Sequence, residues 1–147
     1  MKNNFYKTLE ESIKIKKTLI YLEKDINEAI ELIYNTISKG NKVLICGNGG
    51  SAADAQHLSA EFLIRLRPGV NRKPFPIISL ALDTSTITAC GNDYDFKYIF
   101  SRQLEALGNQ GDIAIVLTTS GNSQNLIEAM KLAKKKKIFT ACFSGNK

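Results

Sequence analysis

Four short apolar runs, each long enough for one buried strand, constrain the fold of this 147-residue chain more than any other feature. They cover residues 42–46, 75–82, 112–120 and 137–143. Helical stretches are expected between them, near 51–66, 94–108 and 123–136. Continuous apolar runs indicate strands buried on both faces, as in a parallel sheet. Strands that alternate with helices predict a three-layer α/β fold, with helices on both faces of that sheet.

The first forty residues predict a helical hairpin that belongs to the same domain as the α/β part at 41–147. One helix carries a stripe of four isoleucines, Ile26, Ile30, Ile33 and Ile37, and Gly40 ends it. Such a stripe must be buried, either on the chain's own core or on a neighbouring subunit. The second alternative gives residues 1–40 a role in oligomerisation.

Composition indicates an ordinary globular protein. Hydrophobic residues make up 44% and charged residues 23%, which excludes disordered, collagen-like and coiled-coil chains. Every apolar run falls short of the roughly 20 residues that cross a bilayer, and the N-terminus lacks a secretory signal. The three cysteines form no CxxC pair and indicate free thiols in a reducing compartment. We therefore expect a cytoplasmic protein without a membrane partner.

The formal charge of +6 permits anionic ligands, from a sugar phosphate to nucleic acid. Four consecutive lysines at 134–137 contribute most of the surplus near the C-terminus. These lysines also end a predicted helix, where cations stabilise the negative end of the helix dipole. The second explanation is favoured, and nucleic acid is not expected as a partner.

The segment TTSGNS, at 118–123, leads from the third apolar run into a helix. It offers four hydroxyls, those of Thr118, Thr119, Ser120 and Ser123. Hydroxyl donors and free amides at a helix start suit a phosphate without a lysine or a metal. The alternative is that Ser123 merely caps the helix, but a cap needs only one hydroxyl. The segment therefore predicts a phosphate site.

The segment GNGGSAADAQH, at 47–57, leads from the first apolar run into another helix. Its glycines allow a small ligand to lie against the backbone. Gly47, Gly49 and Ala52 also fit the dinucleotide fingerprint G-x-G-x-x-G/A, but the acidic residue expected about 20 positions later is missing. A nucleotide-binding domain is therefore the least favoured alternative.

Two further polar groups are candidates for chemistry. His57 and Glu61 are four residues apart, so they share a helix face, where they either bind one metal or supply an acid/base carboxylate. In isolation such a pair is more often a surface contact. Asn92 and Asp93 either bond sugar hydroxyls, with Asp93 as a second catalytic carboxylate, or simply form a turn before the next helix.

Together and in this order, the segments at 46–61, 91–112 and 118–136 resemble the sugar isomerase (SIS) family, and within it the phosphoheptose isomerases. The resemblance implies the SIS fold and a cytosolic homotetramer with sites at subunit interfaces. It also implies conversion of sedoheptulose 7-phosphate to D-glycero-D-manno-heptose 7-phosphate, which serves lipopolysaccharide or other cell-surface glycans.

The resemblance assigns roles to the candidate residues. The sugar would be held by Asn48, Gly49, Gly50, Ser51, Asn92 and Asp93, and the phosphate by Thr118, Thr119, Ser120 and Ser123. His57 and Glu61 match two zinc ligands, and Glu61 also matches the carboxylate that shuttles the proton. The family continues with a further strand and a C-terminal helix, which supply the other zinc ligands, so this chain is expected to be shortened.

A second class of function is a non-catalytic SIS module that binds a phosphosugar or docks a protein, similar to the DnaA initiator-associating protein. The family's C-terminal catalytic histidine motivates this alternative, because the sequence ends before it. His57 and Glu61 argue against it, since a binding module has no need of that pair.

Overall fold

The structure, a computed structural model, describes residues 2–145, and its contacts divide the chain into two units, residues 1–34 and 35–147. The first unit contains α1 (Lys2–Thr18), the 3-10 helix η1 (Leu19–Leu22) and most of α2 (Glu23–Ser38). The second unit contains the sheet and its covering helices. None of the helices described is long and apolar enough to cross a membrane.

The N-terminal segment is helical, but its two helices are not separated by the turn that a hairpin requires. Thr18 before η1 and Glu23 after it both have right-handed helical backbone angles, φ −72°, ψ −13° and φ −53°, ψ −44°. Helical backbone therefore continues from α1 through η1 into α2. No glycine or proline lies between Thr18 and Glu23 to break it. The structure thus replaces the expected hairpin with a segmented helix, and its role in oligomerisation stays a prediction.

α2 ends at Ser38 in a Schellman motif centred on Gly40. The Asn41 amide donates to the Thr36 carbonyl at 3.1 Å, and the Gly40 amide donates to the Ile37 carbonyl at 3.0 Å. Gly40 has a φ of +81°, a left-handed conformation that glycine adopts without a side-chain clash. The prediction that Gly40 ends this helix is confirmed.

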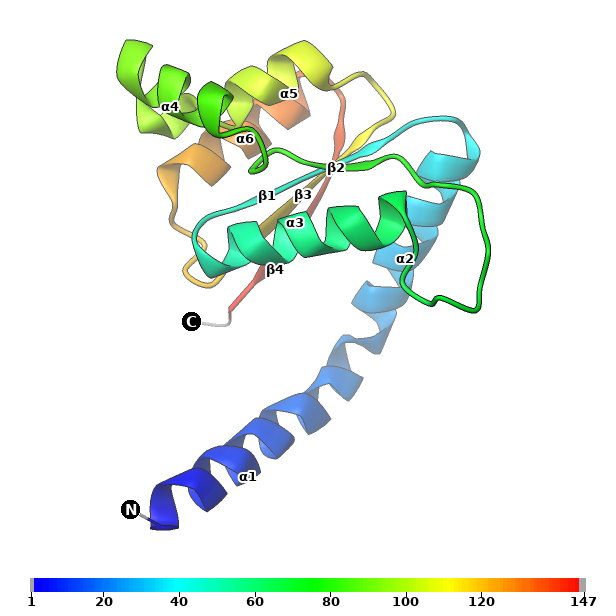
Figure 1. The fold of residues 1–147 in the computed structure, drawn as a ribbon, viewed down its shortest axis with the longest axis vertical. Helices are drawn as coiled ribbons and strands as arrows, with labels where there is room; N and C mark the ends of the chain where they lie inside the picture. Colours follow the sequence, from blue (N-terminus) through cyan, green and yellow to red (C-terminus); the bar gives the residue numbers. More distant parts are fainter. Residues whose placement is uncertain (1, 146–147) are drawn as a thin grey trace. The chain divides into compact units, whose positions relative to one another are not determined.

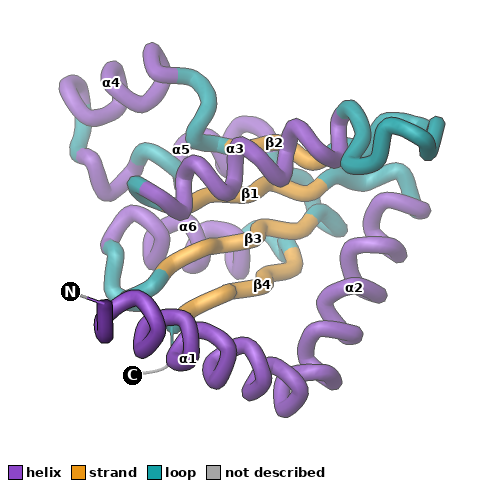
Figure 2. Tube along the Cα trace, turned by 60° about the horizontal axis from the view of Figure 1, so that its bottom comes forward, coloured by secondary structure: helices purple, strands orange, loops and turns teal. Residues whose placement is uncertain are grey.

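Four parallel strands form the sheet in the order β2-β1-β3-β4 (Figure 2). They are β1 (Val43–Gly47), β2 (Ile77–Ser79), β3 (Ile113–Thr118) and β4 (Phe139–Ser144), one from each apolar run. β1 pairs with β3 from Val43↔Ile113 to Gly47↔Leu117, and all of β1 is buried. Burial on both faces explains the continuous apolar sequence of this strand. β4 forms one edge and is largely exposed.

Helices cover both faces of the sheet (Figure 1). On one face α3 (Gly50–Leu63) packs on β1 and β2. On the other lie α4 (Thr84–Asp93), the 3-10 helix η2 (Phe96–Tyr98), α5 (Ser101–Leu107) and α6 (Gln124–Lys135). The main core lies on this second face and includes Leu44, Phe100 and Leu104, each at most 1% exposed. The three-layer α/β prediction is confirmed.

α4 occupies a segment for which the sequence analysis expected no helix. Asp83 caps it, because its Oδ1 accepts from the Ser85 amide at 3.0 Å and its Oδ2 accepts from the Thr86 hydroxyl. The helix begins with Thr-Ser-Thr-Ile-Thr, residues whose weak helix propensity concealed it. The cap is therefore the local signal that the sequence analysis overlooked.

The helix expected near 94–108 is divided into η2 and α5. Asp95 has an extended backbone, and its side chain accepts from the Lys97 amide at 2.8 Å, so it starts η2 separately from α4. α5 ends at Leu107, and the Gly108 amide donates to the Leu104 carbonyl at 2.9 Å. These local caps shorten the helix relative to the prediction.

All three cysteines are free thiols. Cys46 in β1 and Cys90 in α4 are buried, whereas Cys142 is exposed because it lies on the edge strand β4. Burial, followed by the influence of Cys142, raises the pKa of Cys46 to about 12. Cys46 is therefore a neutral packing residue at physiological pH.

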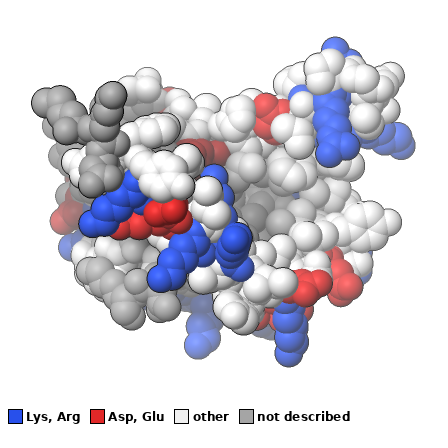
Figure 3. All heavy atoms as spheres, turned by 90° about the horizontal axis from the view of Figure 1, so that it is seen from below, with Lys and Arg blue, Asp and Glu red and all other residues white. Residues whose placement is uncertain are grey.

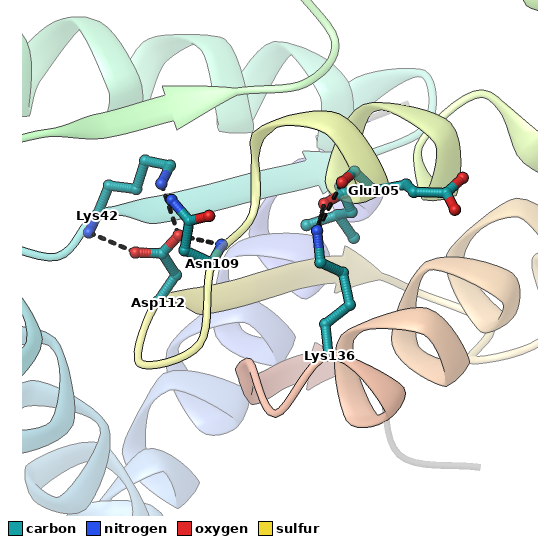
Figure 4. A network of polar contacts seen from close by, with 6 residues as sticks. Lys42, Glu105, Asn109, Asp112 and Lys136 are labelled. Atoms are coloured by element: carbon teal, nitrogen blue, oxygen red, sulfur yellow. Dashed lines mark hydrogen bonds and ion pairs between the residues drawn. The ribbon is translucent and has the colours of Figure 1, made fainter.

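A buried carboxylate joins the starts of β1 and β3 (Figure 4). The Asp112 side chain is 1% exposed and accepts from the Lys42 Nζ at 2.6 Å, the Lys42 amide at 3.0 Å and the Asn109 amide at 2.8 Å. Burial raises the pKa of Asp112, but the hydrogen bonds and charge of Lys42 and the Asn109 amide outweigh it, so the pKa is lowered.

A second lysine, Lys136, holds the end of α5, because its Nζ donates to the Glu105 carbonyl at 2.5 Å (Figure 4).

Replacing Asp112 by Asn should lower the free energy of unfolding by about 3 kcal/mol at neutral pH, because it removes one half of a buried ion pair. The folded pKa lies below the unfolded value of 3.8, so the carboxylate stabilises the fold fully above that value. This contribution is lost as the pH falls through the folded pKa. Urea unfolding of wild type and Asp112→Asn across acidic and neutral pH measures both effects.

Glu128→Gln is the control, because the Glu128–Lys131 pair at 2.8 Å is partly exposed to solvent. This change should alter the free energy of unfolding by less than about 0.5 kcal/mol. If the advantage of wild type over Asp112→Asn were the same in strong acid as at neutral pH, the assignment of that advantage to the ionised carboxylate would be wrong.

Candidate functional site

The candidate site lies where the strand order reverses, between β1 and β3. From β1 the chain crosses to β2 through α3 on one face, and from β3 it crosses to β4 through α6 on the other. The loops that follow β1 and β3 therefore diverge at the carboxyl edge of the sheet, the usual ligand position in open α/β sheets. They are the segments 48–51 and 118–123, here called the sugar loop and the phosphate loop, after the groups that we expect them to hold.

The sugar loop is a tight turn that requires glycine. The Ser51 amide donates to the Asn48 carbonyl at 3.0 Å, and Gly49 has φ +54° and ψ −120°. These angles are those of the first central position in a type II′ turn, which strongly favours glycine. The turn leads directly into α3 at Gly50 and directs Asn48 and Ser51 to the cavity described below.

The phosphate loop is folded by its own hydroxyls. The Thr118 Oγ1 accepts from the Gly121 amide at 3.2 Å, and the Ser120 Oγ accepts from the Asn122 amide at 3.3 Å. Ser123 occupies the cap position of α6, yet within the described chain its side chain makes no capping hydrogen bond. The hydroxyl of Ser123 is therefore available to a ligand, which favours the phosphate prediction over a simple helix cap.

The two loops enclose a cavity of about 60 Å³. Its lining consists of Asn48, Ser51, Leu117, Thr118, Thr119, Ser120, Ser123 and Leu126. The volume suits a small group such as a phosphate, since one water molecule needs about 10–15 Å³ of such a cavity. Among the residues that the structure describes, the lining contains no charged side chain, so hydroxyls, amides and the N-terminus of α6 would hold an anion here.

His57 and Glu61 share one face of α3, with 3.6 Å between the His57 Nε2 and the Glu61 Oε1. The His57 side chain is 74% exposed and that of Glu61 is 24% exposed. Neither lines the cavity, because α3 runs away from the sugar loop at about 1.5 Å per residue, which puts Glu61 about 15 Å beyond Ser51. Residues 2–145 contain no group of three or more metal-binding side chains, so this pair supplies two ligands at most.

Asn92 and Asp93 lie at the end of α4, where Asn92 Nδ2 donates to Asp93 Oδ1 at 2.8 Å. Asp93 lines another cavity, of about 700 Å³, together with Asp83 and Arg102. The structure therefore does not bring Asn92 and Asp93 into the cavity between β1 and β3. Their roles toward a sugar stay predictions.

Basic side chains gather on the loop after α3 (Figure 3). This loop, residues 64–76, contains four basic and no acidic residues. Arg72 is fixed there, because it donates to the Glu61 carbonyl at 2.6 Å and the Phe62 carbonyl at 2.8 Å and lies 4.5 Å above the Phe75 ring. Arg72 thus holds the loop against the end of α3 that carries Glu61.

One residue of the site was missed by the sequence analysis. Asn125, in the first turn of α6, is 3% exposed and exchanges two hydrogen bonds with Asn48 of the sugar loop. A polar amide two residues after the last hydroxyl of the phosphate loop was the available signal. Sequence alone gives no indication of its partner, which lies 77 residues away.

The turn geometry predicts different effects for two neighbouring glycines. Gly49→Ala should lower the free energy of unfolding by about 1–3 kcal/mol, because an alanine must adopt the strained backbone of the turn. A Cβ meets nothing within 4 Å at Gly49 or at Gly50, so packing contributes to neither change. Gly50→Ala, whose φ is not left-handed, is the matched control and should be neutral or slightly stabilising. Urea unfolding measures the free energy of unfolding of both variants. Equal losses of stability in Gly49→Ala and Gly50→Ala would contradict the assignment of the turn.

The SIS domain family model matches residues 5–145 of the chain. A phosphoheptose isomerase of Campylobacter concisus is 52% identical over 117 residues, which are 80% of this chain and 61% of that protein. A phosphoheptose isomerase of Clostridium acetobutylicum is 44% identical over an alignment of 149 positions, which covers 99% of this chain and 74% of that protein. The chain thus spans between about three fifths and three quarters of these two relatives.

Two solved structures have the same fold. The phosphoheptose isomerase of Neisseria gonorrhoeae gives a TM-score of 0.90 at 38% identity, covering 99% of this chain and 75% of that one. A phosphoheptose isomerase from Francisella tularensis gives a TM-score of 0.92 at 36% identity, covering 98% of this chain and 75% of that one. The chain therefore belongs to the SIS domain family and, within it, to the phosphoheptose isomerases, a family of isomerase enzymes.

Proposed function

We propose that the chain isomerises sedoheptulose 7-phosphate to D-glycero-D-manno-heptose 7-phosphate. One observation carries this proposal: the cavity between the two loops, whose described lining combines five hydroxyls with a helix N-terminus and has no charged side chain. The names of the relatives and of the solved structures support the same substrate class. We expect the reaction to take place in the cytoplasm and to supply lipopolysaccharide or other cell-surface glycans.

The phosphate end of the substrate fits the phosphate loop. Hydroxyls from Thr118, Thr119, Ser120 and Ser123 donate to its oxygens, and the N-terminus of α6 stabilises its negative charge. Asn48, Gly49, Gly50 and Ser51 then lie beside the carbon chain, which leaves the cavity on its open side. Fixing the phosphate in this way aligns the distant reacting carbons, so that binding energy is converted into orientation.

The reaction needs one carboxylate that moves a proton, and Glu61 is the candidate. As a general base it takes a proton from C1 of the ketose and leaves an enediolate. It then returns a proton to C2, while the hydroxyl proton of O1 moves to O2, so that an aldehyde forms at C1. Asn92 and Asp93 are proposed to contact the open-chain sugar, with Asp93 as the second carboxylate.

A zinc ion fits the pair of His57 and Glu61, although only in part. The imidazole and the carboxylate are ordinary zinc ligands, and their 3.6 Å separation allows both to face one ion. The remaining ligands must come from outside this pair. A bound zinc ion would act as a Lewis acid on the substrate oxygens.

The site requires two chains if Glu61 is to reach the sugar. Within one chain Glu61 lies about 15 Å along α3 from the sugar loop, which exceeds the reach of its side chain. We propose that the pair of His57 and Glu61 in one subunit serves the phosphate loop of a neighbouring subunit. A homotetramer, in which residues 1–40 pack between subunits, provides such an arrangement.

The reaction is tested by mixing the 147-residue chain with sedoheptulose 7-phosphate and zinc in heavy water and recording proton NMR spectra. The proposal expects aldoheptose signals with deuterium at C2, because a proton held on the base exchanges with solvent. Removal of zinc with a chelator should lower the rate. Binding of the sugar phosphate without any product would contradict isomerisation and favour the non-catalytic SIS module.

Three variants test the assigned roles in the same assay. Glu61→Gln should lower kcat by at least about 100-fold, because it removes the general base. Ser123→Ala should raise KM about tenfold, because one hydrogen bond to a charged group is lost. Thr88→Ala is the control, since that exposed hydroxyl bonds only within α4. Unchanged turnover by Glu61→Gln would refute the proton-shuttle assignment.

A further inference from the structure

Asn48 of the sugar loop and Asn125 in the first turn of α6 form a closed pair of side-chain amides. Asn48 Nδ2 donates to Asn125 Oδ1 at 2.9 Å, and Asn125 Nδ2 donates to Asn48 Oδ1 at 2.8 Å. Each amide therefore acts as donor and acceptor toward the other. Two hydrogen bonds in a ring fix the rotation of both amide groups, which a single hydrogen bond would not.

The two members of the pair have different surroundings. Asn48 is half-buried and lines the cavity, whereas Asn125 is 3% exposed and does not belong to the lining. Asn125 lies instead in α6, whose first turn follows the phosphate loop. A ligand in the cavity thus meets Asn48 but not Asn125.

The amide ring leaves a defined part of Asn48 for a ligand. A carboxamide has two N–H donors and two acceptor lone pairs on its oxygen. The ring uses one donor and one lone pair, so one N–H and one lone pair of Asn48 remain. A sugar hydroxyl, which both donates and accepts, matches this remaining pair of groups.

We propose that Asn125 is a positioning residue that orients Asn48 toward the sugar and fixes the separation of the sugar loop from the phosphate loop. This inference rests on the proposed function, because it assigns the sugar to one loop and the phosphate to the other. Asn125 acts through Asn48 and has no contact with the substrate. The two loops leave the sheet toward opposite faces. The amide ring links the sugar loop directly to the first turn of α6, the helix into which the phosphate loop leads.

The test compares two ligands that differ in how much of the site they occupy. Both ligands place a phosphate in the cavity, where we expect the phosphate loop to supply most of the hydrogen bonds, but only sedoheptulose 7-phosphate extends a carbon chain along the sugar loop. Asn125→Leu keeps a similar volume and removes both hydrogen bonds. It should weaken the binding of sedoheptulose 7-phosphate about tenfold and change the binding of inorganic phosphate by less than twofold, as measured by calorimetric titration.

Gln103→Leu is the matched control for general destabilisation. Gln103 is also a partly buried amide, and it donates to the carbonyls of Leu80 at 2.9 Å and Ile99 at 2.8 Å, away from both loops. This variant should lower the melting temperature as Asn125→Leu does, but leave both dissociation constants unchanged. If Asn125→Leu weakened the binding of inorganic phosphate and of sedoheptulose 7-phosphate equally, the proposal would be overturned. Asn125 would then merely support the fold of the phosphate loop.

A double-mutant cycle tests whether Asn125 acts through Asn48. If it does, Asn48→Leu combined with Asn125→Leu should bind the sugar phosphate no more weakly than Asn48→Leu alone. Additive losses would show an independent role for Asn125 and would overturn the proposal. The kcat of Asn48→Leu and that of Asn125→Leu should also fall together with their affinity for the sugar phosphate, because the orientation of the sugar is lost in both variants.

A measurement without ligand separates this inference from the proposed function. In nitrogen-edited NMR spectra, one side-chain N–H of Asn48 should exchange slowly with solvent in wild type and at least tenfold faster in Asn125→Leu. Protection of this N–H that is independent of Asn125 would overturn the inference whatever the substrate. If wild type shows the protection but binds sedoheptulose 7-phosphate no better than inorganic phosphate, the proposed function fails and the positioning of Asn48 stands.

Discussion

The pairing of β1 with β3 is the constraint on which the rest of the structure depends. Both strands are buried in the middle of the sheet, and the chain leaves them toward opposite faces. Their carboxyl ends therefore open a crevice between the loops that follow them. The ion pair of Lys42 with Asp112 holds the opposite ends of the same two strands. One strand pair thus fixes the register at the centre of the sheet and the points at which the two loops begin.

The sequence was sufficient for the features that depend on local chemistry. Apolar runs located all four strands, Gly40 located the end of α2, and the hydroxyls of 118–123 indicated a loop that the structure shows around a cavity. The sequence was not sufficient for features that depend on weak helix propensity or on contacts between residues far apart in the chain. α4 begins with poor helix formers and depends on its Asp83 cap. Asn125 of α6 bonds to Asn48, which lies in the sugar loop and far away in the sequence.

Apart from Asn92 and Asp93 at the end of α4, the candidate residues fall into two groups that one chain keeps apart. The sugar loop and the phosphate loop share the crevice between β1 and β3, whereas His57 and Glu61 lie toward the far end of α3. Sequence order does not reveal this separation, because Ser51 and Glu61 belong to the same helix. In a helix, ten steps along the chain correspond to about 15 Å. The residues that we propose for binding and for proton transfer therefore lie toward different ends of α3.

The absence of charged side chains from the described lining of the cavity has a consequence for selectivity. Long-range attraction by lysine or arginine weakens strongly with ionic strength, whereas hydrogen bonds from hydroxyls and amides act only at contact. A lining of this kind discriminates by the shape of the anion. A tetrahedral phosphate can accept hydrogen bonds from donors on several sides, whereas a flat carboxylate of equal charge cannot. Such a lining also holds its ligand without strong Coulomb attraction, which permits rapid release of the product.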